Sequence, residues 1–544
     1  MKNYRQKFPL FLIAFVFFSL AIFSAQTAAA KNIQEYNLTI KNEAINIAAI
    51  NAKKITVNVS IPAPILHFKE GDEAVIHVEN KMNSPTAIHW HGLILPGEMD
   101  GVPGFNGFPG IKSGETFTYR FPIKQSGTYW YHAHEMGQEQ DGLYGAIVIA
   151  PQHESIKAQR DYVILLSDVH QEDSSEIMKN LKISSDYYAI SRRTISDFFA
   201  EVKNSGLRTA WQKNKDWNQM RMAKTDLSDV TGYKFLINGK SVDENWTGIF
   251  SPGEKIRLRF INASAMSFFD VRIPGLKMNV VQADGQNIEP VTVDEFRFAP
   301  AETYDVILTP ENQVHSIIAE SLDRSGFAIA TLATKPGLRG EIPQPRPRTN
   351  LTMADMPMEN MKEMDHANMN DHDMESGWAE TNKPKNHKAL AYSDLRYAGV
   401  QQDQRQPSRN IDVRLGGNMQ RYIWTINGKK FSESKPINLE YGERVRLTFT
   451  NETMMAHPMH LHGMFVQLEN GQAAAKLTNK HTVIIPPAGS YSVLITADQP
   501  GEWAFHCHLL YHMMSGMMQK LVVAKLDSAP EKSSTKSARE THAH

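Results

Sequence analysis

The only cysteine of the chain, Cys507, stands between two histidines in the segment HCHLLYHMMSGM, which spans residues 506–517. His512 and Met517 follow it in the same segment. Imidazole, thiolate and thioether groups are ligands that copper binds well. A lone cysteine forms no internal disulfide, so this thiol is available as a metal ligand or as a nucleophile. The segment therefore indicates a metal site.

Four His-x-His pairs occur in the chain, two near each end. Histidines follow Gly71 at offsets of 18 and 20 residues, and they follow Gly442 at the same offsets. The segment GTYWYHAHEMGQEQDG matches GEWAFHCHLLYHMMSG in the same way. The eight residues are His89, His91, His132, His134, His460, His462, His506 and His508. Equal offsets predict that the two ends of the chain are copies of one module.

Each His-x-His pair directs two imidazoles to one side of a strand, because residues i and i+2 share a face. Eight neutral imidazoles can hold a cluster of about three metal ions. Since the pairs come from two modules, the sequence predicts a cluster at the interface between them. One such pair would be weak evidence, because core packing explains it equally well, but four pairs at repeated offsets are specific.

The thiol of Cys507 points to the opposite face of its strand from the two flanking histidines. There it can meet His457, His512 and Met517. Two imidazoles, a thiolate and a distant axial methionine are the ligands of a blue-copper site. Cys507 would then belong to one metal site while its two neighbours belong to another, which gives electrons a covalent path between the sites.

Short runs of alternating apolar and polar residues, such as EAVIHVEN and RVRLTFTN, accompany these histidines. A third copy, KIRLRFIN, occurs in the middle of the chain after Gly253. Offsets 18 and 20 fall there on Val271 and Ile273, so this copy lacks the ligands. The pattern predicts an all-β protein of three Greek-key β-sandwich modules.

Two stretches break this pattern. Residues of about 170–225 have a helical pattern and form an insertion in the middle module. Residues 336–390 have the composition of a flexible, Met-rich linker. Seven of its methionines are candidates for Cu(I) recruitment, because thioethers suit Cu(I), and a spacer without copper affinity is the alternative. They are Met353, Met356, Met358, Met361, Met364, Met369 and Met374.

The ends of the chain have their own signals. Residues 1–30 carry a basic start, an apolar run and the small residues QTAAA, as in a signal peptide, with a retained membrane anchor as the alternative. The predicted domains are 31–155, 156–335 and 391–526, followed by a disordered tail at 527–544. Lys plus Arg is 58 and Asp plus Glu is 59, so the charge balance gives no support for a nucleic-acid partner.

Four segments, HWHG, YHAH, HPMHLHG and HCHLLYHMMSGM, resemble the copper-binding motifs of multicopper oxidases. The middle segments SDYYAISRRTISDFF and SAMSFFDVRIPGLKMNVVQADGQ resemble the bacterial copper-resistance protein A branch of that family. The similarity covers essentially the whole chain after the signal peptide. It implies cupredoxin-like domains and four copper ions: one type 1, one type 2 and a type 3 pair.

The resemblance also implies a role for each matching position. His457, Cys507, His512 and Met517 correspond to the type 1 ligands. His89 and His460 correspond to the type 2 ligands. The type 3 ligands would be His91, His132, His134, His462, His506 and His508. The implied mechanism is four one-electron oxidations at the type 1 site, electron transfer through Cys507, and reduction of O₂ to water at the trinuclear cluster.

Asp100, in GEMDGVPG, is expected to relay protons to the cluster, because an acid in this stretch is linked to the cluster in relatives. The alternative is a turn residue, since Asp-Gly is a common turn pair. Seven further histidines are expected to be surface or satisfied core residues. They are His67, His77, His153, His170, His315, His387 and His481.

Three functions remain open. The first is a cuprous oxidase in copper tolerance, acting in the periplasm on Cu(I) and O₂. The second is a laccase-like oxidase of phenols or aromatic amines, and the third is a protein that sequesters copper without turnover. The usual export signal of this branch contains two arginines, whereas this sequence has only Arg5 there, which leaves the export route open. A monomer suffices, because one chain carries both ligand-bearing modules. No stable membrane insertion is expected after cleavage of the signal peptide.

Overall fold

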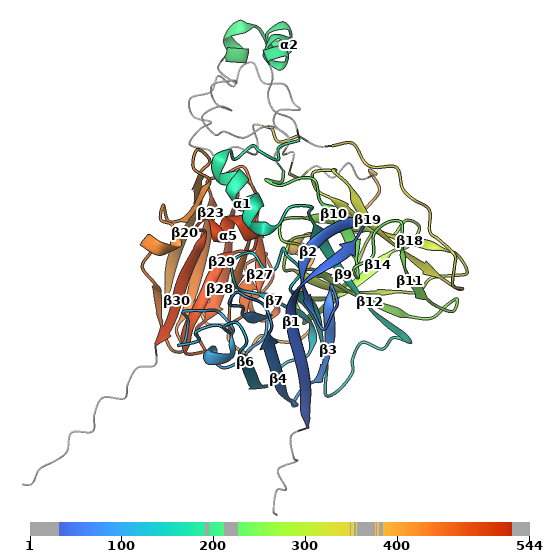
Figure 1. Ribbon diagram of the computed structural model, residues 1–544, viewed down its shortest axis with the longest axis vertical. Coiled ribbons are helices and arrows are strands. Elements are labelled where there is room, and N and C mark those ends of the chain that lie inside the picture. The colour runs from blue at the N-terminus through green and yellow to red at the C-terminus, as the bar shows by residue number, and fades with distance from the viewer. Residues whose placement is uncertain are drawn as a thin grey trace, which may run out of the picture.

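The computed structural model describes residues 32–190, 195–211, 227–348, 350–352, 355, 376, 378–379 and 384–524. The predicted signal peptide, the seven linker methionines and the predicted tail lie outside these residues. Within them, the strands form six β-sheets, two in each of three modules (Figure 1). We call these the first module (β1 to β8), the middle module (β9 to β19) and the third module (β20 to β30).

The first module has two four-stranded sheets. One has the order β2 (Ile50–Val57), β1 (Ile33–Ile47), β4 (Glu73–Asn80) and β6 (Thr116–Pro122). The other has the order β3 (Ala63–Lys69), β8 (Tyr144–Ala150), β7 (Gly127–Ala133) and β5 (Ile88–His91). The run EAVIHVEN is β4, and its alternate residues Ala74, Ile76 and Val78 are fully buried. Every second side chain of this strand thus faces the core of the module, as expected for a strand that is buried on one face.

The middle module has a six-stranded and a five-stranded sheet. The first has the order β10 (Lys234–Ile237), β9 (Arg160–Val169), β12 (Ile256–Asn262), β17 (Thr303–Leu308), β14 (Met278–Ala283) and β15 (Gln286–Val293). The second has the order β11 (Trp246–Ile249), β19 (Phe327–Ala333), β18 (His315–Ser321), β13 (Phe269–Arg272) and β16 (Glu295–Phe298). Val271 and Ile273, at the positions where the other modules have histidines, are buried in the apolar core.

The third module also has a six-stranded and a five-stranded sheet. The first has the order β21 (Ile423–Ile426), β20 (Arg409–Asn418), β23 (Arg444–Asn451), β28 (Ser490–Thr496), β25 (Val466–Leu468) and β26 (Asn479–Lys480). The second has the order β22 (Ile437–Glu440), β30 (Met518–Ala524), β29 (Gly501–Cys507), β24 (His457–Leu461) and β27 (Thr482–Ile485). The short helix α5 (Leu510–Met514) follows β29 directly.

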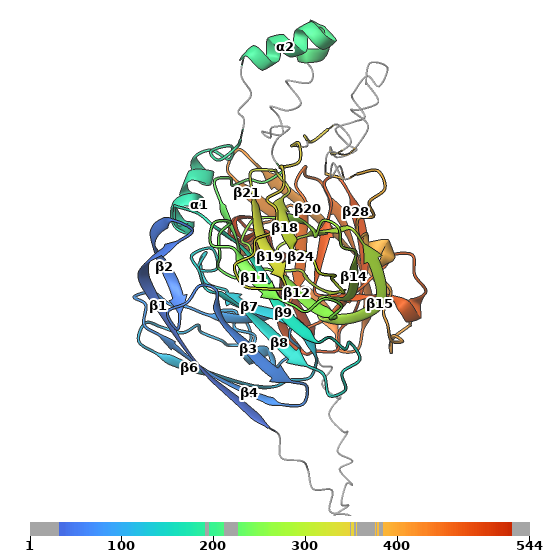
Figure 2. The ribbon, with the colours of Figure 1, turned by 90° about the vertical axis from the view of Figure 1, so that its right-hand side faces the viewer.

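Two helices, α1 (Ser174–Ile183) and α2 (Ile195–Ser205), lie in the stretch for which a helical insertion was predicted. The Asp173 side chain caps α1 by accepting a hydrogen bond from the Glu176 amide, which satisfies an amide that the helix itself leaves free. The amide of Ser174 donates to Asp141 of the first module, and Lys182 donates to the carbonyl of Tyr422 in the third. Helix α1 therefore bridges these modules, whereas α2 stands away from the sheets (Figure 2).

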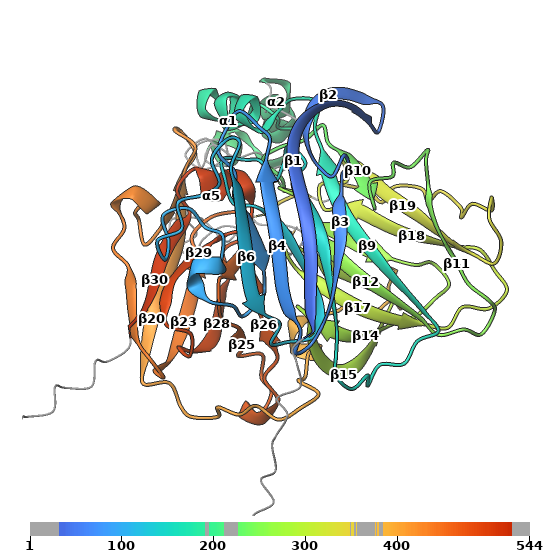
Figure 3. The ribbon, with the colours of Figure 1, turned by 60° about the horizontal axis from the view of Figure 1, so that its bottom comes forward.

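The three modules share apolar seams. In the view of Figure 3 the blue strands of the first module are seen between the orange-red third module and the green-yellow middle module, and buried residues of the middle and third modules pack in one common core. Val102 and Phe105 of the first module pack against Ala504 and Met518 of the third. The prediction of an all-β fold of three sandwich modules with a helical insertion is confirmed. No helix among the described residues is long and apolar enough to span a membrane.

Candidate metal centre

The two His-x-His pairs of each module lie on neighbouring antiparallel strands. In the first module β5 pairs with β7 so that His89 stands opposite His132. In the third module β24 pairs with β29 so that His460 stands opposite His506. Directly opposed residues of an antiparallel pair have Cα atoms about 5 Å apart. The repeat seen in the sequence therefore reproduces one histidine arrangement twice.

The two arrangements face each other across the module interface. The ring centroids of His89 and His462 are 3.8 Å apart, and those of His91 and His460 are 3.7 Å apart and stacked. The rings of His134 and His506 are 5.3 Å apart. All eight imidazoles are buried, with His134 the most exposed at 9 %. The structure thus brings all eight predicted residues together at the interface where the sequence placed them.

One ring nitrogen of most of these histidines has no hydrogen-bond partner among the described residues. These atoms are the Nε2 atoms of His89, His132, His134, His460 and His508, and Nδ1 of His91. The Nε2 atoms of His462 and His506 face each other at 3.0 Å. An unpartnered buried polar group costs about 1–3 kcal/mol, so such an array needs a ligand to explain it. Lone pairs on neutral imidazoles suit copper ions, and the residues therefore fit a copper cluster.

For several of these histidines the opposite ring nitrogen is held by a protein acceptor. His462 Nδ1 donates to Asp100 Oδ2 at 2.8 Å, and His89 Nδ1 donates to the Asp100 carbonyl at 2.9 Å. His132 Nδ1 lies 2.7 Å from Glu139 Oε2. An acceptor at one nitrogen fixes the tautomer and presents the other nitrogen to a metal. Asp100 therefore orients histidines from both modules.

Burial favours the neutral form of seven of these eight imidazoles and of His457. Loss of water around the charged form lowers the pKa of His506 to about 4. The same cause lowers the pKa well below its usual range for His91, His132, His134, His457, His460, His462 and His508. Neutral imidazoles are the form that binds metal.

We expect the copper-free protein to lose stability as the pH falls from 6.5 towards 4. In this window the unfolded chain binds protons at histidines that stay neutral in the folded state, so the free energy of unfolding decreases on acidification. The slope is about 1.4 kcal/mol per pH unit for each such histidine. Burial raises the pKa of Glu139, which acts in the opposite direction, but the buried histidines outnumber such carboxyl groups. Urea unfolding at several pH values measures this, and a flat profile would contradict it.

The second predicted site lies on the other face of β29. Cys507 Sγ is 3.5 Å from His457 Nδ1 and 3.8 Å from His512 Nδ1, and these two nitrogens are 3.2 Å apart. Met517 is fully buried, and its carbonyl accepts a hydrogen bond from the Cys507 amide. Burial raises the pKa of the Cys507 thiol, so it ionises only when a metal ion binds it. The donor set of two imidazoles and a thiol fits a copper ion.

Asp229, which the sequence analysis did not identify, contacts this second site from the middle module. Its Oδ2 atom accepts hydrogen bonds from His512 Nε2 at 2.8 Å and from the Tyr422 hydroxyl at 2.7 Å. The acceptor at Nε2 leaves Nδ1 of His512 for the metal, facing Cys507. No local motif marks Asp229, because it lies 283 residues from its partner in the chain.

Replacing Asp229 with alanine is expected to lower copper affinity at this site by about 10- to 100-fold, as loss of such outer partners typically does. The buried Nε2–H of His512 would lose its acceptor. Chelator competition, followed by the visible absorption of the site, measures the change. Asp229→Asn is the matched control, because its side-chain oxygen can still accept from His512. Equal losses in both variants would contradict the role of the hydrogen bond.

The chain matches family models on three stretches. Each model is described as multicopper oxidase, and they match residues 39–154, 160–335 and 404–527. Copper resistance protein A of Escherichia coli is 43% identical over 92% of this chain and 94% of that protein. A copper resistance protein A homolog of Pseudomonas syringae pv. tomato is also 43% identical, over 90% of this chain and 92% of that one.

Solved structures with similar folds include the multicopper oxidase Fet3p, which functions in iron import, and the laccase of Botrytis aclada. The first has a TM-score of 0.68 at 19% identity and covers 90% of each chain. The second has a TM-score of 0.67 at 21% identity and covers 90% of this chain and 88% of that one. At these identities the likeness establishes the fold, with its cupredoxin-like domains.

Proposed function

The chain belongs to the multicopper oxidase family, in the copper resistance protein A group, and from this premise we propose that it couples one-electron oxidations to the reduction of O₂ to water. Family membership makes it a copper-dependent oxidase. The eight converging histidines, six of which have a buried ring nitrogen without a partner among the described residues, are the observation that carries the finer proposal. When bound, copper supplies one-electron redox chemistry and the binding of O₂.

We assign four copper ions to the two sites. His457, Cys507, His512 and Met517 would hold the type 1 ion. His89 and His460 would hold the type 2 ion. The other six histidines of the cluster would hold the type 3 pair. The strand β29 supports this assignment, because it presents Cys507 on one face and His506 towards the other site, where His508, the next residue after the strand, lies against His91 and His132.

Asp100 is proposed to pass protons to the cluster. It is 1 % exposed, its Oδ2 accepts from His462, and its Oδ1 lies 3.3 Å from His89 Nδ1. The turn interpretation has its own support, because a Cβ atom at Gly101 would lie 1.7 Å from the carbonyl oxygen of Ile88. The steric requirement of the turn falls on Gly101 and not on Asp100, so it does not account for the carboxyl group that residue 100 places beside the cluster.

Asp100→Asn is expected to lower O₂ turnover by about 100-fold, the size of effect typical of a lost proton-transfer group. The asparagine oxygen can still accept from His462, so copper content and type 1 colour are expected to remain. Glu98→Gln is a control, because Glu98 is exposed and lies only two residues before Asp100. The measurement is O₂ uptake over a pH range. Unchanged O₂ turnover with a normal type 1 colour would contradict the proposal that Asp100 relays protons.

We further propose that Cu(I) is the physiological electron donor. Support comes from the relatives named copper resistance protein A and from the Met-rich segment between the middle and third modules. An oxidase of phenols is the second candidate, because laccases of Cryptococcus neoformans are 25% identical over 86–90% of this chain. We also propose that residues 1–30 direct export to the periplasm. We further propose that the domains have the three ranges predicted from the sequence and that the protein is a monomer.

O₂ uptake with Cu(I) and with a simple phenol separates these candidates. The copper-loaded full chain would be compared with a variant in which the seven methionines of residues 353–374 are serines, which keeps the length of the segment. Fast uptake with Cu(I) that falls in the variant supports a cuprous oxidase supplied by this segment. Faster uptake with phenol, equal in both proteins, supports a laccase. No O₂ uptake with either donor at full copper load would support a protein that sequesters copper without turnover.

A further inference from the structure

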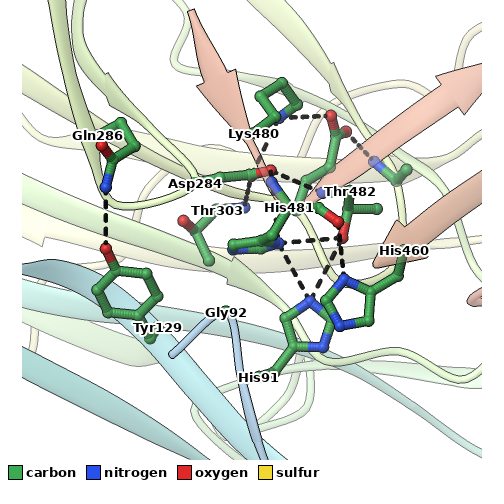
Figure 4. A network of polar contacts seen from close by, with 12 residues as sticks. His91, Gly92, Tyr129, Asp284, Gln286, Thr303, His460, Lys480, His481 and Thr482 are labelled. Carbon is green, nitrogen blue, oxygen red and sulfur yellow. Dashed lines mark hydrogen bonds and ion pairs between the residues drawn. The ribbon is translucent and has the colours of Figure 1, made fainter. Parts of the chain in front are cut away.

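His481, expected from the sequence to be a surface or satisfied core residue, lies beside the histidine cluster. It stands between β26 and β27 of the third module and is 1 % exposed. Its Nδ1 atom is 3.2 Å from Nε2 of His91 in the first module, as Figure 4 shows. The hydroxyl oxygen of Thr482 lies 3.3 Å from Nε2 of His91. His91 is therefore held from the third module, 390 residues away in the chain.

His91 differs from the other members of the cluster in the nitrogen it leaves free. Its unpartnered atom is Nδ1, whereas His89, His132, His134, His460 and His508 leave Nε2 unpartnered. To offer Nδ1 to a metal, a neutral imidazole must carry its proton on Nε2. That proton needs an acceptor in the buried interior. The Nδ1 lone pair of His481, 3.2 Å away, is in position to accept it. The Thr482 hydroxyl, 3.3 Å from Nε2 of His91 and 3.1 Å from Nδ1 of His481, is the alternative acceptor, and Oδ2 of Asp284 lies 3.5 Å from Nδ1 of His481.

The backbone of His481 contacts a second member of the cluster. His460 Nδ1 donates a hydrogen bond to the His481 carbonyl at 2.7 Å, which leaves Nε2 of His460 free. One residue thus holds the orientation of two cluster histidines, His91 through its ring and His460 through its backbone. Gly92 leaves room for this ring, because a Cβ atom there would lie 2.5 Å from Cδ2 of His481.

The middle module, which has no cluster histidine of its own, anchors His481. Asp284 lies in the turn between β14 and β15, and its Oδ2 accepts from the amides of His481 and Thr482 at 3.0 and 3.1 Å (Figure 4). Its Oδ1 lies 3.0 Å from Nζ of Lys480, which in turn lies 3.0 Å from Glu302. These three charged side chains are fully buried. Paired charges of this kind fix a segment in one position, because breaking the pairing leaves a buried charge.

We propose that His481 is a positioning residue that accepts the Nε2 proton of His91 and thereby makes Nδ1 of His91 the copper ligand. Asp284 holds His481 in place for this task. The middle module therefore supplies no ligand to the cluster; it contributes Asp284, which holds the segment of His481 in place. The inference rests on the proposed trinuclear site. It places the proton of His481 on Nε2, which is buried without a partner among the described residues, and it makes His481 a partner of a ligand. Copper binding by His481 itself, together with His91 and His460, is the alternative that the test separates.

The test compares three variants of the copper-loaded full chain. His481→Leu removes the acceptor and is expected to lower copper affinity at the cluster by about 10- to 100-fold. His481→Asn places an oxygen near the position of Nδ1 and is expected to restore most of this affinity. His481→Gln places its oxygen farther out, near the position of Nε2, and is expected to restore less. Chelator competition and the EPR spectrum of the cluster are the readouts, and a retained type 1 colour shows that each variant is folded.

Two results would overturn the inference. Wild-type affinity and spectra in His481→Leu would make His481 a core residue without effect on the cluster. Loss of as much copper in His481→Asn as in His481→Leu would mean that His481 binds copper itself. Thr482→Val is the matched control, since it removes the alternative acceptor and leaves His481. Failure of the wild-type protein to load the cluster would instead contradict the proposed function, so the two failures are distinguishable.

Discussion

Replacing Cys507 with serine is expected to abolish oxidase turnover while leaving the histidine cluster able to bind copper. Cys507 contacts His457 and His512 on one face of β29, and its neighbours His506 and His508 belong to the cluster on the other face. Serine lacks the thiol that we propose to bind copper as a thiolate and to link the two sites. We expect the blue absorption to disappear, O₂ uptake to fall to background, and the EPR signal of the cluster to persist.

Met517→Leu is the matched control for Cys507→Ser. It alters the same site and keeps the volume of the fully buried side chain, while the thiolate bridge remains. This variant is expected to retain a blue colour and measurable turnover. Turnover of the serine variant close to that of the wild type would contradict the role of Cys507 as the electron path. Loss of copper from both sites in the serine variant would show a structural rather than an electronic role.

Alanine at His132 in the first module and alanine at His506 in the third are expected to have the same effect. Both residues face one cluster at the module interface, where their rings contact His134, His462 and His508. Removing either ligand should abolish O₂ reduction while the type 1 site keeps its colour. The measurements are copper content, O₂ uptake and the visible spectrum of each variant.

His67→Ala is the control for these substitutions, because His67 is exposed on β3 of the first module. It is expected to behave like the wild type. If His132→Ala lost turnover but His506→Ala kept it, the cluster would belong to the first module alone. A bleached type 1 site in both variants would show that the two metal sites do not fold independently.

The sequence predicted the parts of the centre that are encoded locally. A strand places residues i and i+2 on one face, so a His-x-His pair already implies two convergent ligands, and equal offsets imply two equal modules. The opposite orientation of Cys507 follows from the same period of two. These rules are sufficient to predict that the four pairs meet and that Cys507 lies with His457 and His512, as the structure shows.

The residues that orient the ligands could not be predicted in this way. Asp229 and Asp284 belong to the middle module and reach ligand-bearing segments of the third module only through the packing of modules. His481 stands in no repeated motif, and its contact with His91 depends on the closed interface. Glu139 is nearer, five residues after His134, but acids after a histidine are common on surfaces, so its burial against His132 had no sequence signal.

The number of electrons used per O₂ molecule tests the central claim most directly. The copper-loaded wild-type protein would be supplied with limiting Cu(I), with O₂ consumption followed by an electrode and peroxide measured at the end. A cluster that joins both ligand-bearing modules to the site of Cys507 predicts four Cu(I) ions oxidised for each O₂, with water as the product. Two Cu(I) ions per O₂ with accumulation of peroxide, or full copper load without uptake, would contradict it.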